Sequence, residues 1–583
     1  MIKTLAKCIR EAKLPAILTP IFVLLESLIE VLIPTIMAKL IDDGITLGNM
    51  DAVVKYGAIL AVLTLAAMFF GVTAGYTASR ASSLFSRNVR HDMYYNIQNF
   101  SFSNIDKFSP ASLVTRLTTD VTNVQMAFQM ITRIVFRAPA MLIFACIFSF
   151  RTSAELSMVF VWVIPFLAII LAIIVKTAFP IFRKVFTTYD DLNNVVEENL
   201  RGIRVVKSFV QEEHEKKKFS KISQKIFNLF TKAEKTVAFN APAMQIAVYT
   251  CIILISWLGA NEIVASGNNE ALGLTTGSLM SLFTYTMQIL MSLMMLSMIF
   301  VMLTMSRASA DRVCEVLNEK SDINDGERNI KEIKDGSIEF RNVCFKYFKT
   351  AENNALDHIN LTINSGETIG IIGGTGSSKS TLVQMIPRLY DAIEGEVFVG
   401  GENVRDYNLE ALRNNVAMVL QKNVLFSGTI SENIRWGNEN ASDEEVEQVC
   451  RSACADDFIQ SMPEKYNTYI EQGGTNVSGG QKQRLCIARA LLKKPKILIL
   501  DDSTSAVDTK TDAMIRRAFR EDIPDTTKII IAQRISSVCD ADKIIIMDNG
   551  KIADMGNHDE LYARSPIYRE IYDSQTKGAG EDE

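Results

Sequence analysis

A glycine-rich stretch in the second half of the chain carries the residue types that bind phosphate. ETIGIIGGTGSSKSTLVQMI, residues 367–386, places an apolar strand before a glycine turn and a helix after it. In such a loop, backbone N–H groups and the helix N-terminus cradle phosphates, a lysine reaches the β- and γ-phosphates, and a hydroxyl ligates Mg²⁺. The predicted nucleotide-binding residues are Gly373, Gly374, Thr375, Gly376, Ser377, Ser378, Lys379, Ser380 and Thr381.

A pair of acidic residues completes this chemistry. KPKILILDD ends an apolar strand with Asp501 and Asp502. Asp501 is predicted to hold the Mg²⁺ shell through water, with Ser380 as a direct ligand. The usual loop pattern, G-x-x-x-x-G-K-[ST], has glycine where this chain has Ser378. If that position needs a positive φ, serine is strained there.

The chain that must position these residues has 583 residues, too many for one core. Long apolar runs dominate up to about residue 305, and the remainder has the composition of a soluble α/β domain. We therefore expect a multi-domain protein, with an all-α membrane domain of six helices followed by an α/β P-loop domain. The predicted limits are an amphipathic N-terminal helix at the membrane surface (1–13), a membrane domain (14–306), a linker (307–335), a nucleotide-binding domain (336–573) and a disordered tail (574–583).

Six stretches are long enough to span a bilayer, which takes roughly 20 apolar residues. Lys and Arg gather at the N-terminus and in the two long connections between spans, but are scarce in the short ones. The positive-inside rule then places the N-terminus, the long connections and the nucleotide-binding domain in the cytoplasm. The predicted spans are about 14–38, 54–79, 131–150, 155–179, 241–265 and 275–305.

Charge and cysteine content exclude other classes. The net charge of −5 comes without a basic patch, so nucleic acid is not an expected partner. Nine cysteines are scattered without metal-ligand spacing, and even Cys450 and Cys454, one helical turn apart, have no His nearby. Reduced thiols are the simplest interpretation.

Polar residues inside the spans leave two interpretations open. Glu26 and Glu30 lie one turn apart in the first span, and either line a substrate cavity or pair between helices. For Arg133 and Arg137, pairing or an interfacial position is the preferred interpretation. Methionines at helical spacing in the last span either contact an apolar substrate or pack against other helices: Met287, Met291, Met294, Met298, Met302 and Met305.

Between the loop and the acidic pair lies TNVSGGQKQRLCIARALL, residues 475–492. With the six spans, this combination makes nearly the whole chain resemble the ATP-binding cassette (ABC) exporters, as a half-transporter. The resemblance implies a fold of the ABC exporter type, ATP and Mg²⁺ as ligands, and two nucleotide domains closing head to tail around two ATP molecules. A signature motif then binds the γ-phosphate of the nucleotide on the other subunit. Here the signature residues would be Ser478, Gly479, Gly480 and Gln481.

Further roles follow from the same resemblance. Tyr347 in FKYF is similar to the adenine-stacking aromatic, and Gln421 in VLQKNVLF to the glutamine that senses γ-phosphate and Mg²⁺. The stretch from Ser505 to Asp508 is similar to the D-loop, which touches the opposite site. Segments near 102–117 and 206–217 match the coupling helices at the tips of the long connections.

Two positions depart from the family pattern on the same side of the site as Ser378. Asp502 stands where the family has a catalytic Glu, and Gln533 where it has a switch His. A carboxylate one methylene shorter places the attacking water poorly, and Gln cannot carry the charge of an imidazole. The signature keeps its pattern apart from Val477. We therefore predict a heterodimer, in which this chain's own site hydrolyses ATP poorly and its signature serves a partner with an intact Glu and His.

The resulting prediction is a subunit of an ATP-driven exporter in the bacterial cytoplasmic membrane, moving hydrophobic or amphipathic substrates; multidrug transport is the family default. Drugs, peptides and lipids all fit the composition. Two alternatives remain: a homodimeric exporter of lipid or peptide with a slow Asp-based ATPase, and a non-transporting ATP-gated regulator or channel.

Overall fold

The computed structural model describes residues 1–268, 273–348, 351–503 and 506–577. The chain divides into two compact units. The membrane unit comprises Met1–Asn99 and Ser109–Glu319, and the ATP unit comprises Phe100–Phe108 and Lys320–Glu583.

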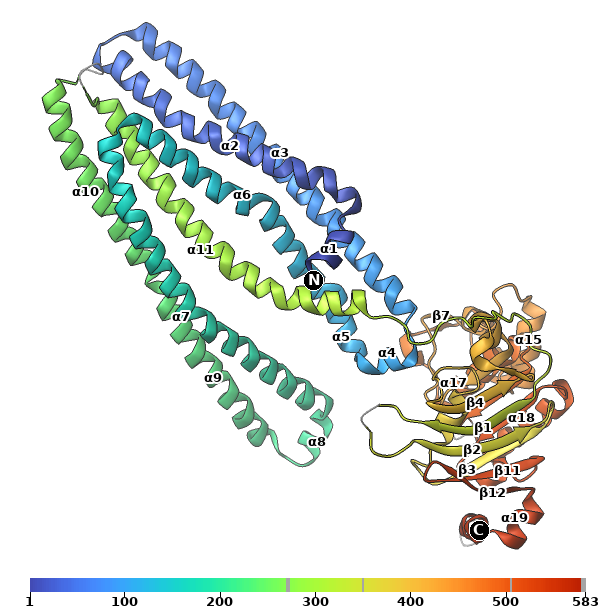
Figure 1. Cartoon of the computed structure of the whole chain (residues 1–583). Coiled ribbons are helices and arrows are strands. Elements are labelled where there is room, and N and C mark those ends of the chain that lie inside the picture. The colour runs from blue at the N-terminus through green and yellow to red at the C-terminus, as the bar shows by residue number, and fades with distance from the viewer. Residues whose placement is uncertain (269–272, 349–350, 504–505, 578–583) are drawn as a thin grey trace. The chain divides into compact units, whose positions relative to one another are not determined.

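The membrane unit consists of helices joined by short connections, with no strand among its described residues (Figure 1). α2, α3, α6 and α11 pack on one another, and α7 packs along α9 and α10. Short α8 joins α7 to α9. The helices are α1 (Ile2–Lys7), α2 (Lys13–Lys39), α3 (Met50–Gln98), α5 (Pro110–Thr115), α6 (Val121–Thr152), α7 (Ala154–Arg201), α8 (Ile203–Ser208), α9 (Glu212–Ala238), α10 (Asn240–Ser266) and α11 (Thr276–Asn318).

Six helical segments of the described residues are long and apolar enough to cross a membrane, by length and composition. Each overlaps one predicted span, so the predicted number and order of spans are confirmed. The segments are Arg10–Thr46, Met50–Gln98, Pro110–Thr152, Ala154–Arg201, Glu212–Ser266 and Thr276–Leu296.

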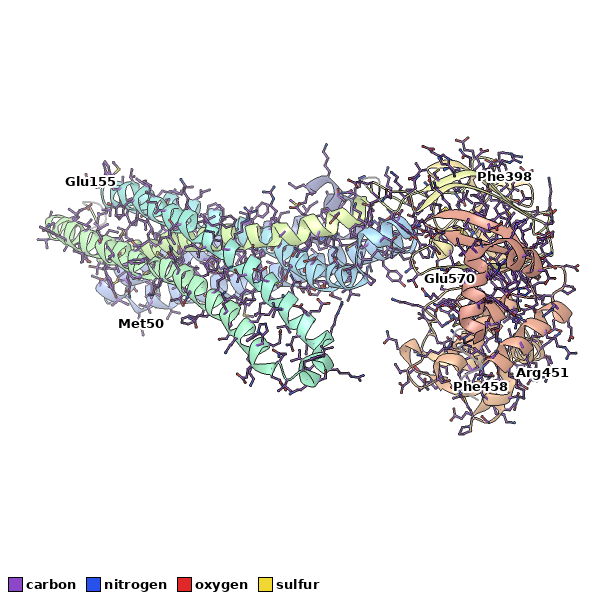
Figure 2. All side chains as sticks on the ribbon, turned by 90° about the horizontal axis from the view of Figure 1, so that it is seen from below. Met50, Glu155, Phe398, Arg451, Phe458 and Glu570 are labelled. Carbon is purple, nitrogen blue, oxygen red and sulfur yellow. The ribbon has the colours of Figure 1, made fainter. Side chains whose placement is uncertain are left out.

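Local chemistry explains where these long helices begin and end. Asn49 caps α3 by accepting hydrogen bonds from two backbone N–H groups, and Ser153 caps α7 by accepting one from the N–H of Leu156. Gly267 ends α10 in the left-handed conformation at φ 63°. Figure 2 shows Met50 and Glu155, at the starts of α3 and α7, at one end of the unit. Two of the predicted short loops therefore lie at the same end.

The ATP unit is built on three sheets. Its strands are β1 (Ile338–Phe345), β2 (Leu356–Ile363), β3 (Thr368–Gly373), β4 (Glu394–Val399), β5 (Glu402–Asn403), β6 (Val416–Val419), β7 (Gly428–Thr429), β8 (Tyr469–Ile470), β9 (Ile497–Asp501), β10 (Thr527–Ile531), β11 (Lys543–Asp548) and β12 (Lys551–Gly556). Its helices are α4 (Phe102–Lys107), α12 (Lys379–Gln384), α13 (Leu409–Asn415), α14 (Ile430–Arg435), α15 (Asp443–Ser452), α16 (Asp456–Gln460), α17 (Gly479–Leu492), α18 (Thr509–Asp522), α19 (His558–Arg564) and α20 (Pro566–Lys577).

The central sheet positions the site. Its order is β12-β11-β3-β10-β9-β6, parallel except for β12. β9 and β10 are buried at every residue, as expected for apolar strands covered on both faces. Because β10 lies between β3 and β9, the loops that leave the carboxyl ends of these three strands share one edge. The antiparallel sheet, β2-β1-β4-β5, shares a hydrophobic core with it.

Two predicted boundaries differ from the structure, and one predicted helix is divided. The predicted linker, 307–335, begins with helix, because α11 continues to Asn318. Val313 and Val316 on this extension are fully buried, and Arg312 pairs with Asp120, so the extension belongs to the membrane unit.

The predicted tail, 574–583, likewise begins with helix, because α20 continues to Lys577. Gln575 is held there by hydrogen bonds to two backbone groups. Residues 578–583 lie outside the described residues. The predicted N-terminal helix, 1–13, is divided: α1 ends at Lys7 and α2 begins at Lys13. Arg10, at φ 38°, turns the chain between them and pairs with Asp92.

Candidate functional site

The glycine-rich loop follows β3 directly and leads into α12. Gly373 has a φ of 154°, and a Cβ there would lie 2.2 Å from the carbonyl oxygen of Met547. Only glycine fits so close to β11, which explains its position at the end of β3. The loop therefore has the strand–turn–helix context that a phosphate-binding loop requires.

Ser378 adopts the left-handed conformation, with φ 69° and ψ 24°. The usual pattern has glycine here, and the strain anticipated from the sequence is present in the backbone. A non-glycine residue in this region costs about 1–2 kcal/mol. The structure retains the loop with this strain built in.

Lys379 folds back over the loop. Its Nζ donates to the carbonyl oxygens of Gly373 and Gly374 at 2.9 and 2.8 Å, and to Ser377 Oγ at 3.2 Å. Burial lowers the pKa of Lys379, although the carboxylates of Asp501 and Asp502 act in the opposite direction. The ammonium is thus held where the phosphates of a nucleotide would lie.

Ser380 and Asp501 form the oxygen pair proposed for Mg²⁺. Ser380 Oγ donates to Asp501 Oδ1 at 2.9 Å. A hydroxyl and a carboxylate are the hard oxygen donors that Mg²⁺ takes, so the pair fits Ser380 as a direct ligand and Asp501 as the partner of a water ligand. Burial raises the pKa of Asp501, the charge of Asp502 adds to this, and the hydrogen bond from Ser380 opposes it.

Asp502 and Gln533 come together at the ends of β9 and β10. Gln533 Nε2 donates to Asp502 Oδ2 at 2.7 Å. Asp502 is buried, its φ is 49°, and its N–H donates to the carbonyl oxygen of Ile531 at 3.0 Å. Register explains the contact, because Ile531 at the end of β10 pairs with Asp501.

Tyr347 lies beside the loop. Its hydroxyl is 2.8 Å from Thr381 Oγ1, and its ring meets those of Phe345 and Tyr390 edge to face. The side chain remains 44% exposed, which leaves ring surface available for stacking. Burial raises the pKa of Tyr347, which therefore stays a neutral phenol at physiological pH.

Tyr390 links this aromatic cluster to α4. Its hydroxyl donates to Asp106 Oδ2 at 2.7 Å, and its ring lies 5.9 Å from that of Phe102. Burial, with the carboxylate of Asp106 as a second cause, raises the pKa of Tyr390. The sequence placed a coupling segment near 102–117. The structure divides that range, because α4 lies in the ATP unit and α5 in the membrane unit.

The signature residues start α17. Ser478 caps this helix: its Oγ accepts from the N–H of Gln481, and Gln481 Oε1 accepts from the N–H of Ser478 at 2.9 Å. This reciprocal pair fixes the exposed N-terminus on which Gly479 and Gly480 lie. A helix N-terminus with free N–H groups favours an anion.

The remaining predicted site residues belong to other segments of the ATP unit. Asp508 caps α18 by accepting from the N–H of Thr511 at 2.9 Å. Gln421 is exposed, two residues beyond the end of β6. Ser505 of the predicted D-loop lies outside the described residues.

In the membrane unit, the two glutamates of α2 share one arginine of α6. Arg137 pairs with Glu26 and also with Glu30, at 2.8 Å for the latter. The predicted pairing between helices is thus confirmed for Arg137, although the sequence did not assign its partners. Glu26 is buried, and its Oε2 has no hydrogen-bond partner among the residues that the structure describes. Gln288 of α11 donates to the carbonyl oxygen of Glu30 at 3.4 Å and brings a third helix to the cluster.

The methionines of α11 are open to the surroundings within this single chain. The exposed fractions of Met287, Met291, Met294 and Met298 are 43, 63, 44 and 62%. They do not form the core between the chain's own helices, so their predicted packing role would need a second chain. The side chain of Met305 lies outside the described residues.

Three contacts escaped the sequence analysis: Tyr390 with Asp106, the double pairing of Arg137, and the hydrogen bonds of Gln575. The i, i+4 spacing of Glu26 and Glu30 was a usable signal for the double pairing of Arg137.

One cluster of possible metal ligands lies elsewhere in the ATP unit. Cys344, Asp357 and His358 bring their ligand atoms within 4.8 Å of one another. Asn342 already bonds His358, and Lys551 already bonds Asp357, so these contacts account for the cluster.

Both parts of the chain match families of known proteins. Residues 16–293 match the family model "ABC transporter transmembrane region", and residues 356–505 match "ABC transporter". The chain is 36% identical to the uncharacterized ABC transporter ATP-binding protein YfiB of Bacillus subtilis, over 95% of both chains. It is 31% identical to the ATP-dependent lipid A-core flippase of Pseudoalteromonas translucida, over 91% of both.

One solved structure shows the same fold. A bacterial Atm1-family ABC exporter with ATP bound superposes with a TM-score of 0.80, at 22% identity, covering 97% of this chain and 98% of that one.

Proposed function

We propose that this chain, which belongs to the ABC transporter family, is the hydrolysis-impaired half of a heterodimeric exporter. It carries a membrane domain followed by an ATP-binding domain in one polypeptide. Membership of the family implies ATP hydrolysis coupled to transport. The proposal concerns how that work is divided between this chain and a partner half-transporter.

The contact between Asp502 and Gln533 carries the proposal. The carboxylate that would orient the attacking water is one methylene short of the usual Glu. It accepts a hydrogen bond from an amide that cannot gain or lose a proton. General-base catalysis needs a group that holds the water closely and a neighbour that stabilises the developing charge. Asp502 would hold the water poorly, and Gln533 would not stabilise the developing charge.

Binding itself is less affected than hydrolysis. Lys379 would contact the β- and γ-phosphates, and Tyr347 would stack on the adenine. Mg²⁺, held by Ser380, by Gln421 and through water by Asp501, would neutralise phosphate charge. Ser378 adds strain to the loop but leaves its N–H groups in place. We therefore expect this chain's own site to retain ATP.

The signature motif supports the second half of the proposal. Ser478 and Gln481 cap α17 reciprocally and fix its glycine-containing N-terminus as an anion site. This site would complete the catalytic centre of a partner with an intact Glu and His, where hydrolysis would drive the cycle. Binding of two ATP molecules would close the nucleotide domains, and segments including α4 and α8 would transmit that closure to the membrane helices.

The substrate would be a small hydrophobic molecule, a peptide or a lipid, moved out of the cell across the bilayer. The exposed methionines of α11 and the polar cluster of Glu26 and Glu30 are the residues we propose for substrate contact. The distribution of Lys and Arg supports a cytoplasmic N-terminus and a cytoplasmic ATP unit in the plasma membrane. The lipid A-core flippase among the relatives makes a lipid the first substrate to test.

The decisive experiment measures ATPase activity of this chain alone and of this chain co-purified with its natural partner. The pair should be active, the chain alone nearly inactive, and Ser478→Ala in this chain should abolish the activity of the pair. An active homodimer would overturn the heterodimer proposal and make Asp502 a working catalytic carboxylate. Transport of substrate against a gradient by vesicles containing the pair separates an exporter from a regulator or channel.

A further inference from the structure

Gln575, near the end of α20, uses both ends of its amide on one loop. Its Nε2 donates to the carbonyl oxygen of Gln533 at 2.8 Å, and its Oε1 accepts from the N–H of Ile535 at 2.8 Å. The carbonyl of one residue and the N–H of the second residue after it form the pair that a single residue of a neighbouring parallel strand contacts. The side chain of Gln575 therefore replaces a strand neighbour just beyond β10.

We propose that Gln575 is a positioning residue of the nucleotide site, which holds the 533–535 loop so that Gln533 meets Asp502. This inference rests on the proposed function of that site as an ATP site. Three hydrogen bonds connect α20 to Asp502. Two join Gln575 to the loop, and the third runs from Gln533 Nε2 to Asp502 Oδ2.

The platform behind Gln575 is firmly packed. Tyr568 of α20 is fully buried, and its hydroxyl lies 2.7 Å from His558 Nδ1. Ile571 and Tyr572, on the same helix, pack against the core of the ATP unit. The position of Gln533 therefore depends on α20 as well as on the central sheet. From the sequence alone, residue 575 was expected in a disordered tail and had no predicted role.

The chemistry of the side chain is selective. The primary amide donates and accepts at once, whereas Glu lacks the donor for the carbonyl of Gln533, and Ala lacks both groups. Because Gln575 and Gln533 are both exposed, removing the amide leaves no cavity. A positioning role and a merely structural role can therefore be separated by experiment.

The test uses the full chain in lipid nanodiscs, together with its partner if the two purify as a pair, and radiolabelled ATP as the probe. The release phase that disappears in Lys379→Ala belongs to this chain's own site. Gln575→Ala should accelerate that phase about 3- to 10-fold, as expected for the loss of one net hydrogen bond. Gln575→Glu, which keeps the acceptor, should lie between Ala and the unmodified chain.

Two comparisons make the test specific. Ser574→Ala removes an exposed neighbour whose hydroxyl donates to the carbonyl oxygen of Ile571 within α20, and should leave release unchanged. In a Gln533→Ala background, Gln575→Ala should add nothing, because the side chain that it positions is gone. The thermal midpoint of unfolding should match across all variants.

The inference is overturned if Gln575→Ala releases ATP at the unmodified rate, or if its effect persists undiminished in the Gln533→Ala background. If the unmodified chain shows no release phase that depends on Lys379, the proposed ATP site itself is wrong. The two failures are thus distinguishable.

Discussion

Gln533 Nε2 lies 2.7 Å from Asp502 Oδ2, so two of the residues that depart from the pattern of the family contact each other. The amide is a neutral donor that orients the carboxylate without changing charge. A change at one of these positions therefore alters the environment of the other. We expect their substitutions to act as a unit.

Restoring both residues should raise hydrolysis more than restoring either one. Asp502→Glu adds the methylene needed to reach the water, and Gln533→His adds a group able to carry charge. Together they should increase the ATPase rate of this chain's own site by about tenfold or more, whereas each alone should give less. Steady-state phosphate release by the chain without its partner measures this.

Asp502→Asn serves as the opposite control. Because the native site already hydrolyses poorly, Asn should change the ATPase activity of the heterodimer less than about twofold. A large loss would show that Asp502 is the main catalytic carboxylate.

Ser378→Gly should relieve backbone strain in the phosphate loop. The left-handed conformation costs a serine about 1–2 kcal/mol, which glycine would not lose. The greater freedom of glycine in the unfolded chain offsets about 0.5–1 kcal/mol of this stabilisation. The net stabilisation should be about 0.5 kcal/mol, seen as a small rise in Tm without ligand. Thr375→Gly in the same loop is the matched control and should lower Tm, because Thr375 needs no positive φ.

Removal of Arg137 should destabilise the membrane unit. Its guanidinium pairs with both Glu26 and Glu30, and its loss leaves both carboxylates, one of them buried, without this cation. Arg137→Gln should lower the thermal midpoint in detergent by several degrees. Adding Glu26→Gln to that variant should recover part of the loss, and a further loss would contradict the ion-pair account.

On acidification, magnesium binding should be lost at a higher pH than it would be with an aspartate of ordinary pKa. Burial raises the pKa of Asp501, so the carboxylate takes up a proton at a higher pH in the folded protein than in the unfolded chain. Between the two pKa values the folded state binds more protons, so this group's contribution to stability falls as pH rises through that window. Mg²⁺ requires the ionised form, so the advantage of Mg-ATP over ATP should shrink as pH falls toward the raised pKa. Titration calorimetry with Asp501→Asn, which should show no such pH dependence, measures this.

The sequence predicted much of the site because its groups follow strands in a regular order. Gly373, Asp501 and Gln533 lie at or beyond the ends of β3, β9 and β10, and a parallel sheet brings such ends together. The six spans were predictable for a similar reason, since apolar length alone indicates them.

The missed features depend on tertiary contacts between distant residues. Arg137 could pair with either glutamate, and only the packing of α2 on α6 brings it to both. The extension of α11 to Asn318 depends on the ion pair between Arg312 and Asp120, which is 192 residues away in the sequence. Gln575 looks like any polar residue near a terminus until α20 places it beside the loop after β10. Local periodicity carries no information about such partners.

The segment Phe100–Phe108 belongs to the ATP unit although both of its flanks belong to the membrane unit. The polypeptide therefore passes between the units three times, after Asn99, after Phe108 and after Glu319. An ATP domain expressed from Lys320 onward would lack Asp106 and Phe102, and would present Tyr390 without two of its neighbours. A protease cut at Glu319, by contrast, would leave α4 docked in the ATP unit, and the two fragments should still purify together.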